Sequence, residues 1–222
     1  MNPLLITIII YVAVILVVWW FVKKIITAFF VAGILLVLAV LALGYMTYQD
    51  VRDLRENMPT QNKLVILMDQ GRVLSGFTVT PAEALPLTSG ELHAFEALWS
   101  QDRKEEAQGE VYKLIIYEKA MFEGMDDLKI IVAGQSFEKQ HILQLLSDDA
   151  ILNATSQELF FEKPHELRAY VFNELIRIYV VGSGDPTLFA SQFRKGMITI
   201  YPETIIFKIM KYVPLNINPF SA

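Results

Sequence analysis

The beginning of the chain is almost wholly apolar, in contrast to everything that follows it. From Asn2 to Met46 the only charged residues are Lys23 and Lys24. An α-helix rises about 1.5 Å per residue, and it needs about 20 apolar residues to cross a hydrocarbon core of about 30 Å. The runs 4–22 and 25–46 both meet this requirement. The pattern therefore predicts two membrane-spanning helices within residues 1–48.

The lysine pair favours a two-helix hairpin over one continuous helix. A single helix immersed over both runs places two ammonium groups near the middle of the bilayer, at about 2.5–3.5 kcal/mol each. A hairpin places both at its tip, although that turn contains no Gly, Pro or Asn. A cleaved signal peptide is disfavoured, because the first residues carry no charged side chain and the apolar run is long. The expected membrane boundary consists of aromatic and lysine side chains, namely Trp19, Trp20, Lys23, Lys24, Tyr45 and Tyr48.

Small residues gather in the second apolar run. Ala28 and Ala32 are four residues apart and lie on one helix face, next to Gly33. Small residues let membrane helices approach closely, so these three are candidates for packing against the first run or a second copy of the chain. The alternative is ordinary membrane-helix composition, in which Gly and Ala are common.

After residue 48 the pattern becomes that of a folded domain. Residues 49–57 continue the helix, Met58-Pro59 ends it, and a short linker reaches residue 62. Two β-rich runs, 63–68 and 73–79, flank a glycine-containing turn and predict a hairpin.

The rest of the domain predicts alternating strands and helices. The expected strands are 111–117, 128–133, 157–161 and 197–201. The expected helices are 91–108 capped by Ser89 or Gly90, one capped by Ser136, 164–181, 185–195 and 204–212, with a loop at 148–156.

This order of elements is typical of an α+β fold. We expect one soluble domain, 63–214, built on a mixed or antiparallel sheet with helices packed on one face, followed by an irregular tail, 215–222. Residues 49–62 form the juxtamembrane helix and linker between the hairpin and this domain.

Charge and composition narrow the class of function. From Thr60 onward the chain carries 15 Lys and Arg against 21 Asp and Glu, a net charge of −6. An acidic domain argues against nucleic acid as a partner, because phosphate binding needs a basic surface. The chain has no cysteine, which excludes disulfides, thiolate metal sites and a cysteine nucleophile.

The side of the membrane on which the domain lies is weakly indicated. Lys23 and Lys24 favour a cytoplasmic turn, whereas Arg52, Arg55 and Lys63 favour a cytoplasmic domain. The uncharged N-terminus and the Asn153 glycosylation sequon (Asn153-Ala154-Thr155) tilt the expectation slightly to the outside.

Candidate chemistry is sparse. His93, His141 and His165 have no second histidine at metal-ligand spacing, so we expect no metal and no cofactor, and we assign no catalytic residue. One loop could approach an anion through free backbone amides at a helix start, and it consists of Gly182, Ser183, Gly184 and Asp185. Because Asp185 would itself repel an anion, a hinge between two helices is the simpler interpretation.

No motif in the chain identifies a family, so the function is expected by elimination. We expect an integral membrane protein with a non-catalytic role in binding or scaffolding, or as an accessory subunit of a membrane complex. Its partners are the lipid bilayer and another protein or a second copy. One alternative is a membrane-bound hydrolase with a site built from scattered acids and His93 or His165. Another is a self-associating membrane assembly.

Overall fold

The computed structural model describes residues 3–183 and 185–212, and the expected tail 215–222 lies outside these residues. The helices are α1 (Pro3–Asn57), α2 (Ser89–Ser100), α3 (Lys104–Gln108), α4 (Ala120–Glu123), α5 (Lys139–Ser147), α6 (Asp149–Glu158), α7 (Pro164–Leu175), η1 (Ile176–Val181), α8 (Pro186–Arg194) and α9 (Ile205–Met210). The strands are β1 (Lys63–Asp69), β2 (Arg72–Val79), β3 (Ala84–Pro86), β4 (Lys113–Glu118), β5 (Lys129–Val132), β6 (Gln135–Glu138) and β7 (Ile198–Tyr201).

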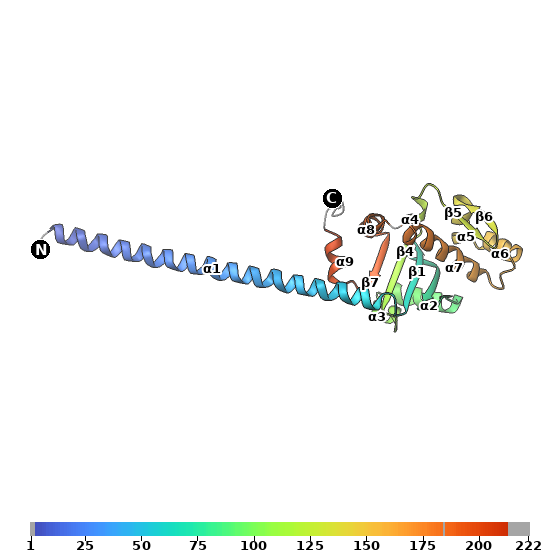
Figure 1. Ribbon diagram of the computed structural model, residues 1–222, viewed down its shortest axis with the longest axis horizontal. Helices are drawn as coiled ribbons and strands as arrows, with labels where there is room; N and C mark the ends of the chain where they lie inside the picture. Colours follow the sequence, from blue (N-terminus) through green and yellow to red (C-terminus); the bar gives the residue numbers. More distant parts are fainter. Residues whose placement is uncertain (1–2, 184, 213–222) are drawn as a thin grey trace. The chain divides into compact units, whose positions relative to one another are not determined.

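Helix α1 replaces the expected two-helix hairpin. Lys23 and Lys24 lie inside this continuous helix, so the turn predicted at them is wrong (Figure 1). The local sequence explains the difference, since no Gly, Pro or Asn interrupts the backbone ladder and Thr27 Oγ1 donates to Lys23 O at 2.9 Å. One stretch of the described chain, Val14–Asn57, is long and apolar enough to cross a membrane.

The chain divides into two compact units, Met1–Gln49 and Asp50–Ala222. In the first, every side chain described from residue 14 to residue 46 is exposed. The second contains the last turns of α1 and all the strands, and it is an α+β unit, as the sequence predicts.

The main sheet is mixed and has the strand order β3-β2-β1-β4-β7. Strands β1 and β4 are parallel and the other neighbours are antiparallel. The β1–β2 hairpin closes with Gln70 and Gly71, both at positive φ (52° and 88°), which suits the right-handed twist of paired strands. A parallel pair needs a crossover, and β2, β3, α2 and α3 supply it between β1 and β4.

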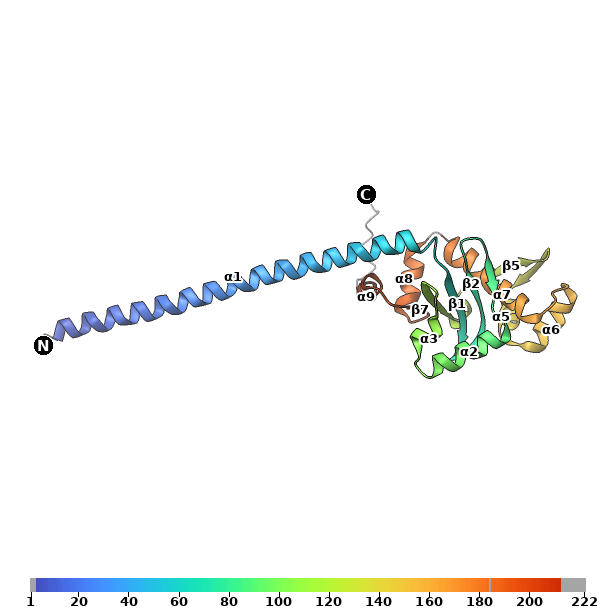
Figure 2. The ribbon, with the colours of Figure 1, turned by 90° about the horizontal axis from the view of Figure 1, so that it is seen from below.

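Helices cover both faces of the sheet, so the expectation of helices on one face is wrong (Figure 2). One core forms around Phe172, with residues from α5, α7 and α8, and the other forms around Phe95 with α2 and α3. The reason lies in the central strands, where consecutive residues are buried, for example 65–68 of β1. A strand that is apolar on both faces needs a covering layer on each.

The helix expected over 91–108 is divided in two. Thr88, rather than Ser89 or Gly90, is the N-cap, and it forms a reciprocal capping box with Glu91. Helix α2 ends at Ser100, and the chain passes through Asp102 at φ 59° before α3 begins. Gly109 then ends α3, as the sequence predicts.

The segment 133–161 differs most from expectation. Ala133 and Gly134 form a tight turn (φ 47° and 84°), so Ser136 belongs to strand β6 instead of capping a helix. Asp148 caps helix α6 where a loop was expected, and no strand forms at 157–161. The turn was missed because Ala-Gly lacks the Asn or Asp that usually marks such a hairpin.

The long helix expected over 164–181 changes its geometry halfway. Helix α7 ends at Leu175, and the π-helix η1 follows it to Val181. The predicted helix after Asp185 and the predicted strand near 197–201 are present as α8 and β7.

A candidate amphiphile-binding cavity

A cavity of the second unit has a volume of about 840 Å³ and lies on the sheet face that carries the Phe172 core. Cavities of about 300–1,000 Å³ are typical of small-molecule sites. The residues that line it are Leu54, Met58, Lys63, Val65, Phe77, Val79, Ile115, Tyr117, Asn173, Ile176, Arg177, Val180, Val181, Asp185, Phe189, Ile200 and Phe207.

Alternation along the strands builds the floor of this cavity. Side chains two residues apart on a strand share a face, so Lys63 and Val65 of β1 lie beside Ile115 and Tyr117 of β4. β2 contributes Phe77 and Val79, and β7 contributes Ile200. The floor is therefore apolar except at its two ends, where Lys63 and the Tyr117 hydroxyl stand.

The walls come from the last turn of α1 and from the helices near the end of the chain. Leu54 lies in the last turn of α1 and Met58 directly follows this helix, while η1 contributes Ile176, Val180 and the exposed Val181. π-Helical turns are rare and occur often at functional sites. The presence of one along the cavity agrees with a binding role for this face.

Gly182 is required at the end of η1 for a steric reason. A Cβ atom at this position would lie 2.8 Å from the backbone oxygens of both Arg177 and Ile178. This approach is closer than a side chain tolerates, so the glycine of the predicted ligand loop lets η1 close. Its φ is −72°, so no unusual backbone conformation is involved.

The other described residues of that loop are structural contacts beside the cavity. Ser183 Oγ donates to Val180 O at 3.1 Å. Asp185 Oδ1 accepts from Thr187 N at 2.8 Å and caps α8, which holds the pKa of this carboxyl below its usual range through hydrogen bonds from Thr187. Asp185 also lines the cavity, whereas Gly184 lies outside the described residues.

Few polar groups reach the cavity. The half-buried Lys63 donates through Nζ to the carbonyl of Met58, the residue that follows α1, and burial lowers the pKa of its ammonium. Arg177 donates to Glu174, a residue outside the lining set. Tyr117 is buried, and burial raises the pKa of its hydroxyl.

Residues expected at the membrane boundary all lie on α1. Trp19, Trp20, Lys23, Lys24, Tyr45 and Tyr48 are exposed along this helix. Lys24 Nζ lies 3.9 Å from the centroid of the Trp20 ring, an arrangement that suits a membrane interface. Ala28, Ala32 and Gly33 are exposed on the same helix, and nothing described lies within 4 Å of a Cβ built on Gly33.

The three histidines lie on three different helices. His93 is exposed on α2, and His141 of α5 packs on the Phe137 ring with its Nε2 buried and unpartnered. His165 of α7 lines a smaller cavity of about 300 Å³ with Glu166, and this cavity shares Phe77 and Asn173 with the large one. Within residues 3–183 and 185–212, no three His, Asp or Glu side chains are grouped as metal ligands would be.

Sequence reasoning missed the cavity and Lys63. The signal was present in part, since Lys63 and Lys113 each stand two residues before an apolar core position, Val65 and Ile115. That spacing places each lysine on the core face of its strand. Only the strand pairing reveals that both lysines are on the same face of one sheet.

In comparisons with protein-family models, with curated proteins and with solved structures, no match to this chain was found.

Proposed function

We propose that this protein is a membrane-anchored, non-catalytic binding protein whose second unit takes the apolar part of an amphiphile into the cavity on the Phe172 side of the sheet. The observation that carries the proposal is that large and mainly apolar cavity, lined in part by the end of the helix whose earlier residues form the anchor. A cavity of this kind binds ligands chiefly through burial of apolar surface, at about 25 cal/mol per Å².

The proposed anchor is the run Ile25–Thr47 of α1. Its 23 residues carry no charge and span about 35 Å as a helix, which exceeds the hydrocarbon thickness of about 30 Å. A helix that is apolar on every side needs an apolar surrounding, and lipid supplies it. Both uncharged runs cannot cross one bilayer as a single straight helix, so one span is proposed in place of two.

We place the second unit on the outer face of the membrane. Lys23 and Lys24 precede the proposed span and carry the positive charge expected on the cytoplasmic side. Beyond the span, Arg52 is paired with Glu56 at 2.8 Å. Protease treatment of sealed, oriented vesicles tests this, because an outer domain is cut without opening the vesicles and a cytoplasmic domain is protected.

Self-association through α1 is a second candidate, favoured by the hollowed helix face at its small residues. Trp20, Lys23, Ala28 and Ala32 border this hollow. Enlarging Ala28, Ala32 and Gly33 together to Leu would block close approach of a second helix. An assembly held together by this face would then dissociate into smaller particles, whereas an unchanged particle size would refute this candidate.

The test of the proposed function fills the cavity. Val180→Trp adds bulk to its wall, and Ile131→Trp introduces the same side chain at a site on β5 that is 62% exposed and outside the lining. Full-length chains in phosphatidylcholine nanodiscs receive photoreactive palmityl alcohol, and adducts are mapped to peptides of residues 50–212. We expect strong labelling at the cavity peptides in the wild type and in Ile131→Trp, and at least a fivefold loss in Val180→Trp. Absence of adducts at the cavity in the wild type would refute the proposal.

A further inference from the structure

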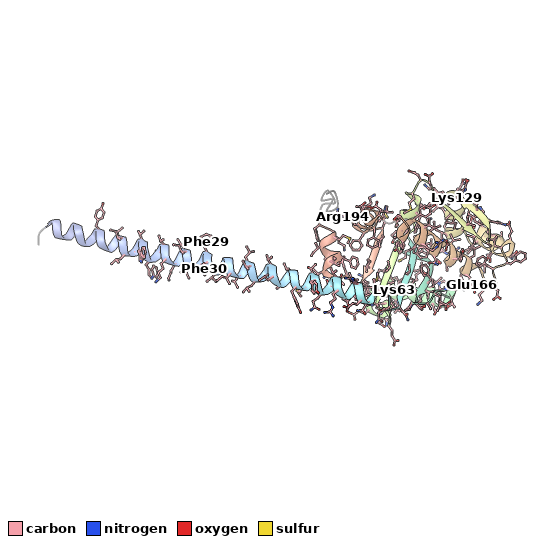
Figure 3. The ribbon with its side chains drawn as sticks, in the orientation of Figure 1. Phe29, Phe30, Lys63, Lys129, Glu166 and Arg194 are labelled. Atoms are coloured by element: carbon pink, nitrogen blue, oxygen red, sulfur yellow. The ribbon has the colours of Figure 1, made fainter. Side chains whose placement is uncertain are left out.

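Two lysines are paired where β1 and β4 begin, and one of them, Lys63, lines the cavity. Lys63 of β1 and Lys113 of β4 are paired residues in the parallel ladder, so both side chains lie on the face that carries Val65 and Ile115. Figure 3 labels Lys63 at the start of β1. Both ammonium groups lose hydration, and burial lowers the pKa of each. Like charges in paired positions of a sheet destabilise it unless other groups compensate them.

Lys113 has its own compensation. Its side chain is buried, and its Nζ donates to Pro202 O at 2.8 Å. The carboxylates of Asp53 and Asp50 act on it electrostatically and raise its pKa against the effect of burial. Those two acids are held in place in turn, since Tyr112 Oη donates to Asp53 and Ile205 N donates to Asp50 Oδ2 at 2.6 Å.

Lys63 lacks comparable compensation. Its Nζ donates to one neutral acceptor, Met58 O, and no carboxylate of the described residues lies within 4.0 Å of it. Asp185 is the one acidic residue of the cavity lining, and its carboxylate is engaged with Thr187. The cavity therefore has an apolar interior and a half-buried cation that has no acidic partner among residues 3–183 and 185–212.

We infer that the ligand of this cavity is an anionic amphiphile, whose carboxylate or phosphate head group binds Lys63 and whose aliphatic tail lies between the sheet and η1. The inference rests on the proposed function, since it names the ligand class of the same cavity. An ionised head group would supply the counter-charge that Lys63 lacks, and a hydrogen bond between two charged groups is stronger than one between neutral groups. The Lys63 ammonium has three donors, so it can bind such a head group while it keeps Met58 O.

The competing explanation is that Lys63 serves only to cap the carbonyl at the end of α1. The two roles predict different effects of removing the charge. If Lys63 is a cap alone, Lys63→Met lowers thermal stability and leaves ligand preference unchanged. If Lys63 binds the head group, the variant loses its preference for anions whether or not its stability falls.

The experiment compares two probes that share an aliphatic chain and differ in the head group, which is ionised in one and neutral in the other. The full-length chain in phosphatidylcholine nanodiscs receives photoreactive palmitic acid or photoreactive palmityl alcohol, at a pH at which the acid is ionised. Adducts on the cavity peptides are quantified by mass spectrometry. We expect about tenfold more labelling by the acid, because one hydrogen bond between charged groups raises the affinity by about that factor. A third arm with photoreactive lysophosphatidic acid shows whether phosphate or carboxylate head groups are bound, and labelling by either anion well above that by the alcohol supports the inference.

Substitutions then test which residue causes the preference for the acid over the alcohol. Lys63→Met should bring the ratio of acid to alcohol labelling to about one, while Lys63→Arg should keep most of it. Lys129→Met removes an exposed lysine of β5 outside the lining and should change nothing (Figure 3).

Two failures are distinguishable. If neither the acid nor lysophosphatidic acid labels the wild-type cavity more strongly than the alcohol does, the inference is overturned and the proposed function stands. Absence of labelling by both probes would overturn the proposed function itself. Because the wild-type ratio needs no substitution, the test holds even if a Lys63 variant fails to fold.

Discussion

The two units of the molecule use the same kinds of residue in opposite ways. Phe29 of α1, which is labelled in Figure 3, is 76% exposed, whereas Phe172 of α7 has no exposed surface. In the first unit, helix α1 has apolar side chains on every side, while the main sheet of the second unit lies between two layers of helices. The difference teaches that apolar composition alone does not determine burial within the protein. Where no polar side is left to face water, the surrounding medium must itself be apolar.

Truncation tests this contrast most severely. A chain that begins at Lys23 keeps the run Ile25–Thr47 and should stay in membranes after alkaline extraction, while a chain that begins at Asp50 should be released completely. Membrane retention of the shorter chain would show that the second unit holds itself to lipid. Release of the longer chain would move the anchor to the first apolar run.

Matched phenylalanine substitutions sharpen the same comparison. Phe172 packs against the rings of Phe77, Tyr117 and Phe122, with centroids 5.4, 6.0 and 6.3 Å away. Phe172→Ala should destabilise the second unit by about 3–5 kcal/mol, because it leaves a cavity in a packed core. Phe29→Ala should leave the thermal unfolding of this unit unchanged. Equal effects in thermal melts of the full-length chain would contradict the distinction between the units.

The buried Tyr117 makes stability depend on alkaline pH. Burial raises the pKa of its hydroxyl, whereas in the unfolded chain it ionises near the ordinary value of 10.0. Above pH 10.0 the unfolded state releases a proton that the folded state keeps, so the free energy of unfolding falls by up to about 1.4 kcal/mol per pH unit. Thermal melts on either side of pH 10.0 should show a smaller fall for Tyr117→Phe than for the wild type.

A neutral substitution in the same cavity is the control. Phe77→Leu removes apolar volume and no ionisable group, so it should lower stability by a similar amount on either side of pH 10.0. If Tyr117→Phe and the wild type lose stability equally above pH 10.0, the hydroxyl is not kept from ionising by the fold.

The smallest expected effect concerns the start of α2. Thr88 Oγ1 accepts from Glu91 N at 3.3 Å, and Thr88 N donates to the Glu91 carboxylate at 2.7 Å. Thr88→Ala removes the cap side chain and should cost about 1 kcal/mol in the free energy of unfolding. The neighbouring Ser89→Ala should be nearly neutral. The reverse order would place the cap at Ser89, as the sequence pattern suggests.

Local sequence was enough wherever neighbours along the chain determine the structure. The uncharged run after Lys24 requires a long apolar helix, Pro59 follows the end of that helix at Asn57, and the glycine turn at Gly71 closes the first hairpin. These features depend on helix length, on a missing amide or on a positive φ, all of which are properties of a few adjacent residues.

The hairpin expected at Lys23 and Lys24 shows where such reasoning stops. The predicted hairpin assumed that lipid surrounds both apolar runs. In that case the free-energy cost of immersing two lysines outweighs the absence of a turn residue. In the structure the backbone preference prevails and the helix continues. The free-energy cost of immersing a lysine depends on where the bilayer lies along the helix. The residues next to the lysine do not determine that position.

The cavity and its lysine were decided by tertiary structure alone. Lys63 and Lys113 are fifty residues apart in the chain, and only the parallel pairing of β1 with β4 places them together on one face. Residues of the π-helical turn Ile176–Val181 also pack against the core on that face. Strand order and register arise from burial summed over the whole unit, whereas propensity and turn chemistry act over a few residues. For that reason the sequence by itself determined the apolar helix and the elements after it, while the candidate binding site required the folded chain.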